Sequence, residues 1–291
     1  MLLESLRDKR YLLVMDDIWN NEVWNEVSTA FPNNSNRSRI LITTRINEVS
    51  LHASSVNNSV PPIPLYELPL LEEDKSWELF SKKVFWGGTC PLELETLGRE
   101  LVKSCHGLPL AIVVLGGLLA CKEKTHRIWS KYIDHVNSYL TDNRSRCREI
   151  LALSYNHLPR CLKPCFLYFG IYPEDFEILV RQLIRLWIAE GFIQQTGNRN
   201  IEDVAEDYLE ELIDRSLIQV ATKRLDGGVK TCRIHDLLRD LCISESSEEK
   251  FLEVHSNVNL SPIGKSRKIS IHYGNNPYIS PALVSLQIVA L

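Results

Sequence analysis

Residues 11–19 (YLLVMDDIW) constrain the fold of this chain more than any other stretch. Five apolar residues run without a polar break, and Asp16 and Asp17 follow them side by side. Such a run is typical of a strand buried on both faces in the middle of a parallel sheet, with helices on either side. Ligands of such sheets bind beyond the carboxyl ends of the strands, so the two aspartates are expected at a binding edge.

Two adjacent carboxylates at a half-buried edge repel each other and lose hydration, so they need donors or a cation to stay ionised. One interpretation is a Walker B element, in which Asp16 holds Mg²⁺ through water and Asp17, as the catalytic residue, polarises a water near the terminal phosphate of a nucleotide. An ordinary strand that ends in an Asp-Asp helix cap fits the same residues equally well. The phosphate loop G-x-x-x-x-G-K-[ST] that serves a Walker B strand is absent from the 291 residues. The chain is therefore expected to hold half a nucleotide site and to bind a nucleotide weakly or not at all.

A second apolar strand is predicted at residues 39–45 (RILITTR). Its carboxyl end delivers the hydroxyls of Thr43 and Thr44 and the guanidinium of Arg45, beside Asp16 and Asp17. An arginine there is suited to contact a γ-phosphate, or alternatively to form a salt bridge with one of the aspartates. A third short strand is predicted at residues 61–68, confined to an edge by its prolines.

From residue 71 onward the pattern predicts helices. They are expected at residues 72–84, 92–105, 109–120 and 129–140, followed by a charged connector at 142–148. Gly107 and Pro109 fit a helix stop and a helix start, so residues 106–111 are explained by helix punctuation alone. Residues 113–120 are apolar all round and are expected to be buried.

A winged-helix arrangement is predicted after residue 151. Helices at 180–188 and 201–214 precede two strands at 217–222 and 229–234, which flank the turn signal Asp226-Gly227-Gly228, and a helix follows at 235–243. Seven acids on the outer face of the second helix would repel phosphate, which disfavours DNA binding. Further strands are expected at 250–254, 267–273 and 283–289.

Composition narrows the class of protein further. The net charge of −4 argues against a partner such as nucleic acid or an anionic membrane. No stretch is long and apolar enough to span a bilayer and the charged start is not a signal peptide, so a cytoplasmic location is expected. The eight cysteines are scattered, and Cys161 and Cys165 are expected to be small core residues rather than a metal pair.

Six segments, in this order, resemble one family. They are residues 12–19 (its kinase-2 motif), 38–45, 65–85, 107–111 (GLPLA), 165–175 (CFLYFGIYPED) and 234–236 (IHD, at its MHD position). The chain is similar over residues 6–245 to plant NB-ARC immune receptors with leucine-rich repeats, of the coiled-coil class whose kinase-2 motif closes on a Trp. It departs from the pattern in the missing phosphate loop, in Ile234 where Met is usual, and in a repeat domain that is cut off.

The resemblance implies a fold class and four domains. The fold is an α/β remnant of a P-loop NTPase parallel sheet, followed by an all-α helical subdomain and a winged-helix subdomain. The implied boundaries are 1–68 for the end of the nucleotide-binding domain, 69–150 for the helical part, 151–245 for the winged helix, and 246–291 for a linker and the start of a leucine-rich repeat domain.

The resemblance also implies a molecular switch rather than an enzyme. ADP holds such a module closed, and exchange for ATP releases the winged helix and permits homo-oligomerisation. By position, Thr44 and Arg45 belong to the nucleotide site and Arg45 distinguishes ATP from ADP. Pro109 packs against the adenine, and His235 reaches the β-phosphate from a helix amino end that favours anions.

The sequence also allows alternative roles for His235 and alternative functions for the whole chain. His235 is otherwise a core or capping histidine, while Asp236 is expected to cap that helix and orient His235. Implied partners are the coiled-coil and leucine-rich repeat domains of a full-length version and a pathogen effector or guarded host protein. The alternative functions are an ATP-hydrolysing STAND-type NTPase and a winged-helix DNA-binding regulator.

Overall fold

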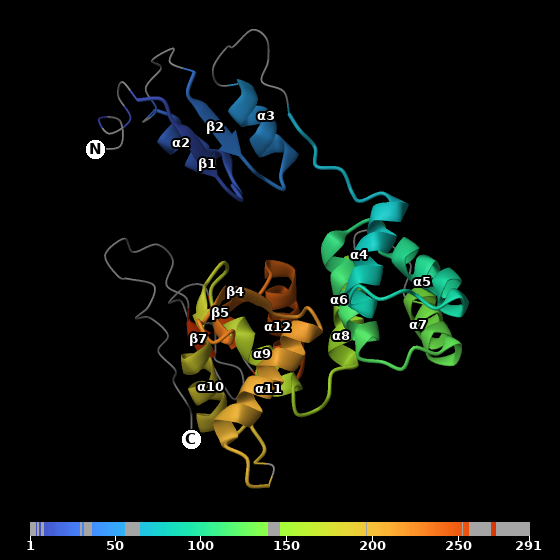
Figure 1. Ribbon diagram of the computed structural model, residues 1–291. Helices are drawn as coiled ribbons and strands as arrows, with labels where there is room; N and C mark the ends of the chain where they lie inside the picture. The colour runs from blue at the N-terminus through green and yellow to red at the C-terminus, as the bar shows by residue number, and fades with distance from the viewer. Residues whose placement is uncertain are drawn as a thin grey trace. The chain divides into compact units, whose positions relative to one another are not determined.

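The computed structural model describes residues 4, 6, 9–29, 31, 37–55, 65–138, 146–195, 197–251, 253–255 and 269–271. The chain divides into two compact units, Met1–Pro69 and Leu70–Leu291. Figure 1 follows the elements of each unit along the chain by colour.

The first unit is built on a two-stranded parallel sheet. Strand β1 (Leu12–Met15) pairs with β2 (Arg39–Ile42), and Val14 lies opposite Leu41. Each strand is followed by a helix, α2 (Asn21–Ser28) after β1 and α3 (Asn47–Ser55) after β2. The buried apolar side chains of this unit are Ile18, Trp24, Val49 and Ala53. This strand-helix alternation with parallel pairing confirms the predicted α/β class.

The expectation that β1 is buried on both faces is wrong. Leu12 and Val14 are 70% and 55% exposed, and Leu41 beside them is 53% exposed. The alternating residue Leu13 is half-buried. Two strands and two short helices have too little apolar surface to cover both faces of a sheet.

Two local predictions in this unit also need correction. Residues 65–68 are not in a strand, and the rest of the predicted strand, 61–64, lies outside the described residues. Helix α3 was not expected from the sequence.

Five helices open the second unit. They are α4 (Glu73–Phe85), α5 (Leu92–Ser104), α6 (Pro109–Ala120), α7 (His126–Ser138) and α8 (Arg146–Asn156). Helix α4 packs on α6, α5 on α7, and α6 on α8. The predicted connector at 142–148 is therefore helical from Arg146, and residues 142–145 lie outside the described part. Phe80 and Trp129, in edge-to-face contact, are fully buried in the core of these helices.

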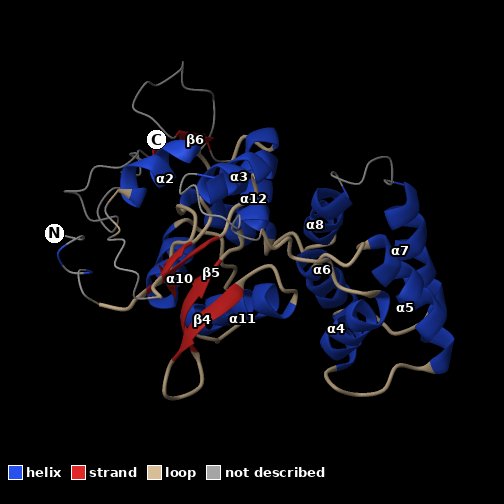
Figure 2. Ribbon diagram, turned by 90° about the horizontal axis from the view of Figure 1, so that it is seen from above, coloured by secondary structure: helices blue, strands red, loops and turns tan. Residues whose placement is uncertain are grey.

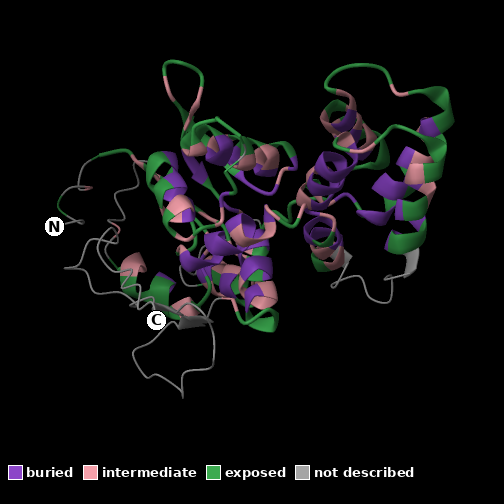
Figure 3. Cartoon of the chain, turned by 90° about the horizontal axis from the view of Figure 1, so that it is seen from below, coloured by how far each residue is buried: buried purple, intermediate pink, exposed green. Residues whose placement is uncertain are grey.

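Helix α6 is covered on all sides from Ala111 to Leu119, as its uniformly apolar sequence predicts, whereas Pro109 at its start is exposed. It begins with Pro109 at the first helical position and contains no charged residue. Ile112 and Leu115 belong to the core of the five helices, whereas Val114 belongs to the core of the elements that follow. Buried residues accordingly line the facing sides of the helices in Figure 3. One helix thus completes two hydrophobic cores.

The next part of the second unit is a winged helix. Its elements are α9 (Lys163–Leu167), the 3-10 helix η1 (Tyr168–Ile171), β3 (Ile178–Leu179), α10 (Val180–Ala189), α11 (Ile201–Asp214), β4 (Gln219–Lys223), β5 (Val229–Arg233) and α12 (Asp236–Glu248). The sheet order is β3-β5-β4, with antiparallel pairing throughout. Gly227 at φ +89° turns the β4–β5 hairpin, which projects from the helices in Figure 2.

A short parallel pair follows the winged helix. Strand β6 (Glu253–His255) pairs with β7 (Ile269–Ile271). Strand β7 lies within its predicted range, whereas β6 only overlaps the end of the range 250–254. The strand expected at 283–289 lies outside the described residues.

The winged helix meets helix α6 through a very close backbone approach. A Cβ placed on Gly117 would lie 2.4 Å from the carbonyl oxygen of Arg215, the residue that follows α11. The Arg215 side chain is 6% exposed and pairs with Glu211 at 2.6 Å. Only a glycine in α6 permits this contact.

Two polar contacts join helix α8 to helix α12 as well. Arg148 donates to the Ser244 hydroxyl at 3.1 Å, and the Tyr155 hydroxyl donates to Glu249 at 2.7 Å. The helical and winged-helix parts are therefore in contact at two places, between Gly117 and Arg215 and between α8 and the α12 region.

His157, just after α8, lies among cationic groups. Its ring centroid is 5.0 Å from that of Tyr132 and 6.1 Å from that of His135. Burial lowers the pKa of His157, and the charges of Lys122 and His135 lower it further. The surroundings of His157 therefore favour its neutral form.

Gly117→Ala is expected to destabilise the chain by about 1–3 kcal/mol, because the added methyl group overlaps the Arg215 backbone. The matched control is Gly116→Ala, whose Cβ meets only side-chain carbons, the nearest being those of Lys83 at 3.1 and 3.2 Å. Lys83 is flexible and alanine is the better helix former, so this control should lose much less stability. Urea unfolding midpoints compare the two, and equal midpoints would contradict the close approach.

His157 is expected to make folding sensitive to mild acid. The unfolded chain takes up a proton at His157 near its ordinary pKa of about 6.5, whereas the folded chain does so only at lower pH. The contribution to stability is complete above about pH 6.5 and declines as the pH falls below it. As the pH falls below about 6.5, the urea midpoint should fall less steeply in His157→Gln than in the parent chain. Parallel plots of midpoint against pH for the two proteins would contradict this prediction.

Candidate functional site

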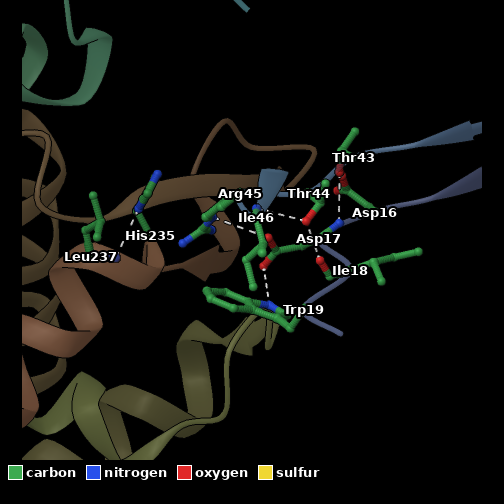
Figure 4. Close-up of polar contacts among 10 residues, drawn as sticks. All are labelled: Asp16, Asp17, Ile18, Trp19, Thr43, Thr44, Arg45, Ile46, His235 and Leu237. Atoms are coloured by element: carbon green, nitrogen blue, oxygen red, sulfur yellow. Dashed lines mark hydrogen bonds and ion pairs between the residues drawn. The ribbon is translucent and has the colours of Figure 1, made fainter. Parts of the chain in front are cut away.

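Polar side chains gather where β1 and β2 end. Asp16 and Asp17 follow β1, and Thr43, Thr44 and Arg45 follow β2. Because the strands run parallel in register, their carboxyl ends meet at one edge of the sheet. Figure 4 shows these side chains converging. The predicted grouping of Asp16, Asp17, Thr44 and Arg45 is thus present within the first unit.

The hydroxyl of Thr43 connects the two aspartates. It accepts a hydrogen bond from the backbone N–H of Asp17 at 2.8 Å and donates one to Asp16 Oδ1. Asp16 is exposed, and its Oδ2 receives no hydrogen bond from the described residues. Asp16 therefore keeps one oxygen for an outside ligand.

Asp17 is used on both of its carboxylate oxygens. Its backbone is left-handed at φ +54°, a conformation that Asp tolerates better than most residues. The indole N–H of Trp19 donates to Asp17 Oδ2 at 3.0 Å, and Arg45 Nε lies 3.3 Å from Oδ1. The alternative interpretation of Arg45, a salt bridge to an aspartate, is the arrangement found here.

Thr44 stabilises the turn after β2. Its hydroxyl donates to the carbonyl of Ile18 at 2.6 Å and accepts from the N–H of Ile46 at 3.1 Å. These bonds fix the direction in which the chain leaves the strand and so position the neighbouring Arg45.

The other predicted site residues belong to the second unit. Pro109 opens helix α6, and His235 precedes helix α12. His235 is the N-cap residue of α12: its Nδ1 accepts from the backbone N–H of Leu237 at 3.2 Å. The expectation that Asp236 caps this helix is wrong, because Asp236 already occupies the first helical position, where its charge favours the helix dipole. Convergence of these residues with those of the first unit stays a prediction.

Two family models match the chain. The NB-ARC domain matches residues 1–90, and the disease resistance protein winged helix domain matches residues 171–242. The chain belongs to the NB-ARC family of disease resistance proteins. The first match covers the β1–β2 site, and the second covers the wing and most of α12.

Plant disease resistance proteins are similar over most of this NB-ARC chain. A putative late blight resistance protein homolog from Solanum demissum is 43% identical over 253 residues, which is 87% of this chain. The ToMV resistance protein Tm-2(2) and the ToMV susceptible protein tm-2, both from Solanum lycopersicum, are 39% and 38% identical over 94% and 95% of it. A resistance protein and a susceptible one are thus equally similar. The chain spans 19% of the length of the first relative and 32% and 33% of the other two.

Metal ligation in this NB-ARC chain was predicted for Asp16. Among the described residues no group of three or more His, Cys, Asp or Glu side chains is placed to hold a metal ion. Mg²⁺ is ordinarily held by one or two carboxylates together with phosphate oxygens and waters. A single exposed carboxylate with one uncommitted oxygen fits that mode. It does not fit a cage built by the protein alone.

Sequence reasoning placed the Thr43 hydroxyl at this edge but gave it no role, and it gave Trp19 no role in the site. Both are adjacent to or within motifs already identified. What they contact depends on the left-handed backbone at Asp17, which has no sequence signal beyond the Asp itself.

In the described part of the chain, no helix is both long and apolar enough to cross a membrane.

His235→Ala is expected to lose the cap of α12 and about 0.5–2 kcal/mol of stability. His235→Asn is the matched control, because asparagine is a strong N-cap residue and restores an acceptor for the Leu237 N–H. Thermal or urea unfolding should rank the asparagine variant close to the parent and above alanine. Equal losses in both variants would show that His235 stabilises the chain in another way.

Proposed function

We propose that this chain is the nucleotide-dependent switch module of a cytoplasmic plant disease resistance protein. The observation that carries the proposal is the convergence of Asp16, Asp17 and Arg45 at the carboxyl edge of a parallel sheet, inside the residues that match the NB-ARC domain. Such an edge is where nucleotides bind in sheets of this class. The similar proteins from Solanum demissum and Solanum lycopersicum support the link to disease resistance.

The residues have separate roles in this proposal. Asp16 uses its uncommitted Oδ2 toward hydrated Mg²⁺, which neutralises phosphate charge when bound. Arg45 binds the terminal phosphate, and Thr44 holds the turn that aims Arg45. Pro109 packs against the adenine.

His235 and Asp236 act at the β-phosphate. The amino end of α12 offers N–H groups and a helix dipole to an anion. His235 caps that end through Nδ1, and its imidazole ring reaches the phosphate in this proposal. Asp236, in the first turn of α12, maintains the helix end that carries His235.

Switching is favoured over turnover. A general base needs a carboxylate oxygen within reach of the water it activates. Asp17 Oδ2 is held by the Trp19 N–H, and Oδ1 becomes available only when Arg45 turns to the phosphate, so Asp17 is not set in place as a base beforehand and supports at most slow hydrolysis. The output in this proposal is a change of conformation, and the ligands are ADP and ATP.

The wider partners follow from the family. In a full-length version the module works with its coiled-coil and leucine-rich repeat domains and forms a homo-oligomer on activation. A pathogen effector or a guarded host protein supplies the signal.

Nucleotide binding is tested on the 291-residue chain by NMR at millimolar ADP, because weak affinity is expected. Mn²⁺ replaces Mg²⁺, so that signals close to the metal broaden. We expect broadening at Asp17 and Arg45 and, as the module closes, at Leu110 and His235. Broadening confined to the first unit would refute a nucleotide site that includes Leu110 and His235. If no signal broadened, nucleotide binding itself would be refuted.

The role of His235 is separated from its capping by His235→Asn. This variant keeps an acceptor for the Leu237 N–H and loses the reach of the imidazole. ADP affinity should fall while stability does not. An unchanged dissociation constant would remove His235 from the phosphate site.

A further inference from the structure

Trp19 is a half-exposed tryptophan that makes two specific contacts at the sheet edge. Its side chain is 51% exposed, so it contributes little to the core. Its indole N–H bonds Asp17 Oδ2, and the guanidinium carbon of Arg45 lies over its ring, 5.2 Å from the centroid. One side chain thus contacts both members of the Asp17–Arg45 ion pair (Figure 4).

The geometry makes these contacts complementary. The bond to Oδ2 turns the carboxylate so that Oδ1 faces Arg45 Nε at 3.3 Å. The ring face attracts the same guanidinium through its negative quadrupole. Neither contact needs the rest of the chain, because residues 17, 19 and 45 all lie in the first unit.

An exposed ion pair by itself is weak. The side chains of Arg45 and Asp17 are 47% and 27% exposed, and pairs in such positions are screened by water and salt. Contacts that fix the rotamers of both partners reduce the entropy cost of pairing. Trp19 supplies one such contact to each partner.

We propose that Trp19 is a positioning residue that holds Arg45 on Asp17, and that a terminal phosphate must displace Asp17 from Arg45 to be bound. Trp19 thereby opposes the nucleoside triphosphate more than the diphosphate. This inference rests on the proposed function for its ligand. The positioning itself concerns only the chain.

The positioning is tested without nucleotide, on the side-chain Nε–Hε NMR signal of Arg45 in the 291-residue chain. The signal is assigned as the one that Arg45→Lys removes, and Asp17→Asn gives its position without the ion pair. Trp19→Leu removes both contacts, whereas Trp19→Phe keeps a ring and loses the N–H donor. We expect the signal to move most of the way to the Asp17→Asn position in Trp19→Leu and part of the way in Trp19→Phe.

Trp86 offers a matched control. It is also exposed, at 69%, and has a cation, Lys83 Nζ, 5.6 Å from its ring centroid, but it belongs to the second unit. Trp86→Leu should leave the Arg45 signal in place. Backbone amides of β1 and β2 report that the sheet is intact, and Trp19→Phe still decides the question if the leucine variant does not fold. An Arg45 signal unchanged in a folded Trp19 variant overturns the proposal.

Discrimination is tested by the ratio of the dissociation constants for ADP and ATP. A weak exposed pair and one cation–π contact predict that Trp19→Leu shifts this ratio toward ATP by about two- to fivefold. An unchanged ratio, with the NMR signal displaced, overturns discrimination and leaves positioning supported. If neither nucleotide binds, discrimination fails together with the proposed function, while the Arg45 signal still decides positioning.

Discussion

The burial of α6 on every side is the constraint on which the second unit depends. A twelve-residue helix without a charged side chain cannot leave a face in water, so two layers of structure must cover it. The neighbouring helices α4 and α8 and the winged-helix core do so, with Val114 directed into the latter. The helical part and the winged helix therefore share one element, and neither core is complete without it.

The sheet edge of the first unit differs from α6, because its charged groups form contacts with one another while they remain exposed to solvent. Asp17 is bound to Trp19 and Arg45, whereas Asp16 keeps one oxygen, so a ligand that binds Arg45 exchanges an existing contact for a new one. Binding that exchanges contacts gains less free energy than binding to unpaired groups. Such a site is better suited to distinguishing similar ligands than to holding one very tightly.

Local patterns predicted the regular elements well. Periodicity identified α10 and α11, the Asp226-Gly227-Gly228 turn identified the hairpin, and the two unbroken apolar runs indicated the parallel pair. Helix α3 was not predicted, because only Val49 and Ala53 are buried and two residues are too few to form a recognisable apolar stripe in the sequence. The exposure of Val14 was missed because an apolar run does not say how many layers cover it. The cap at His235 was predicted only as an alternative, because the neighbouring Asp236 is the stronger cap former by residue type.

The contact between Gly117 and Arg215 also limits how the two parts of the second unit can move. A side chain placed between two elements can change rotamer and follow a small displacement, but here backbone meets backbone with nothing adjustable in between. A gap of about 1 Å would already forfeit a quarter to a half of the dispersion attraction and would be too narrow for water to fill. Small displacements of one part along the other are therefore unfavourable at this contact, which holds the two backbones in a single alignment.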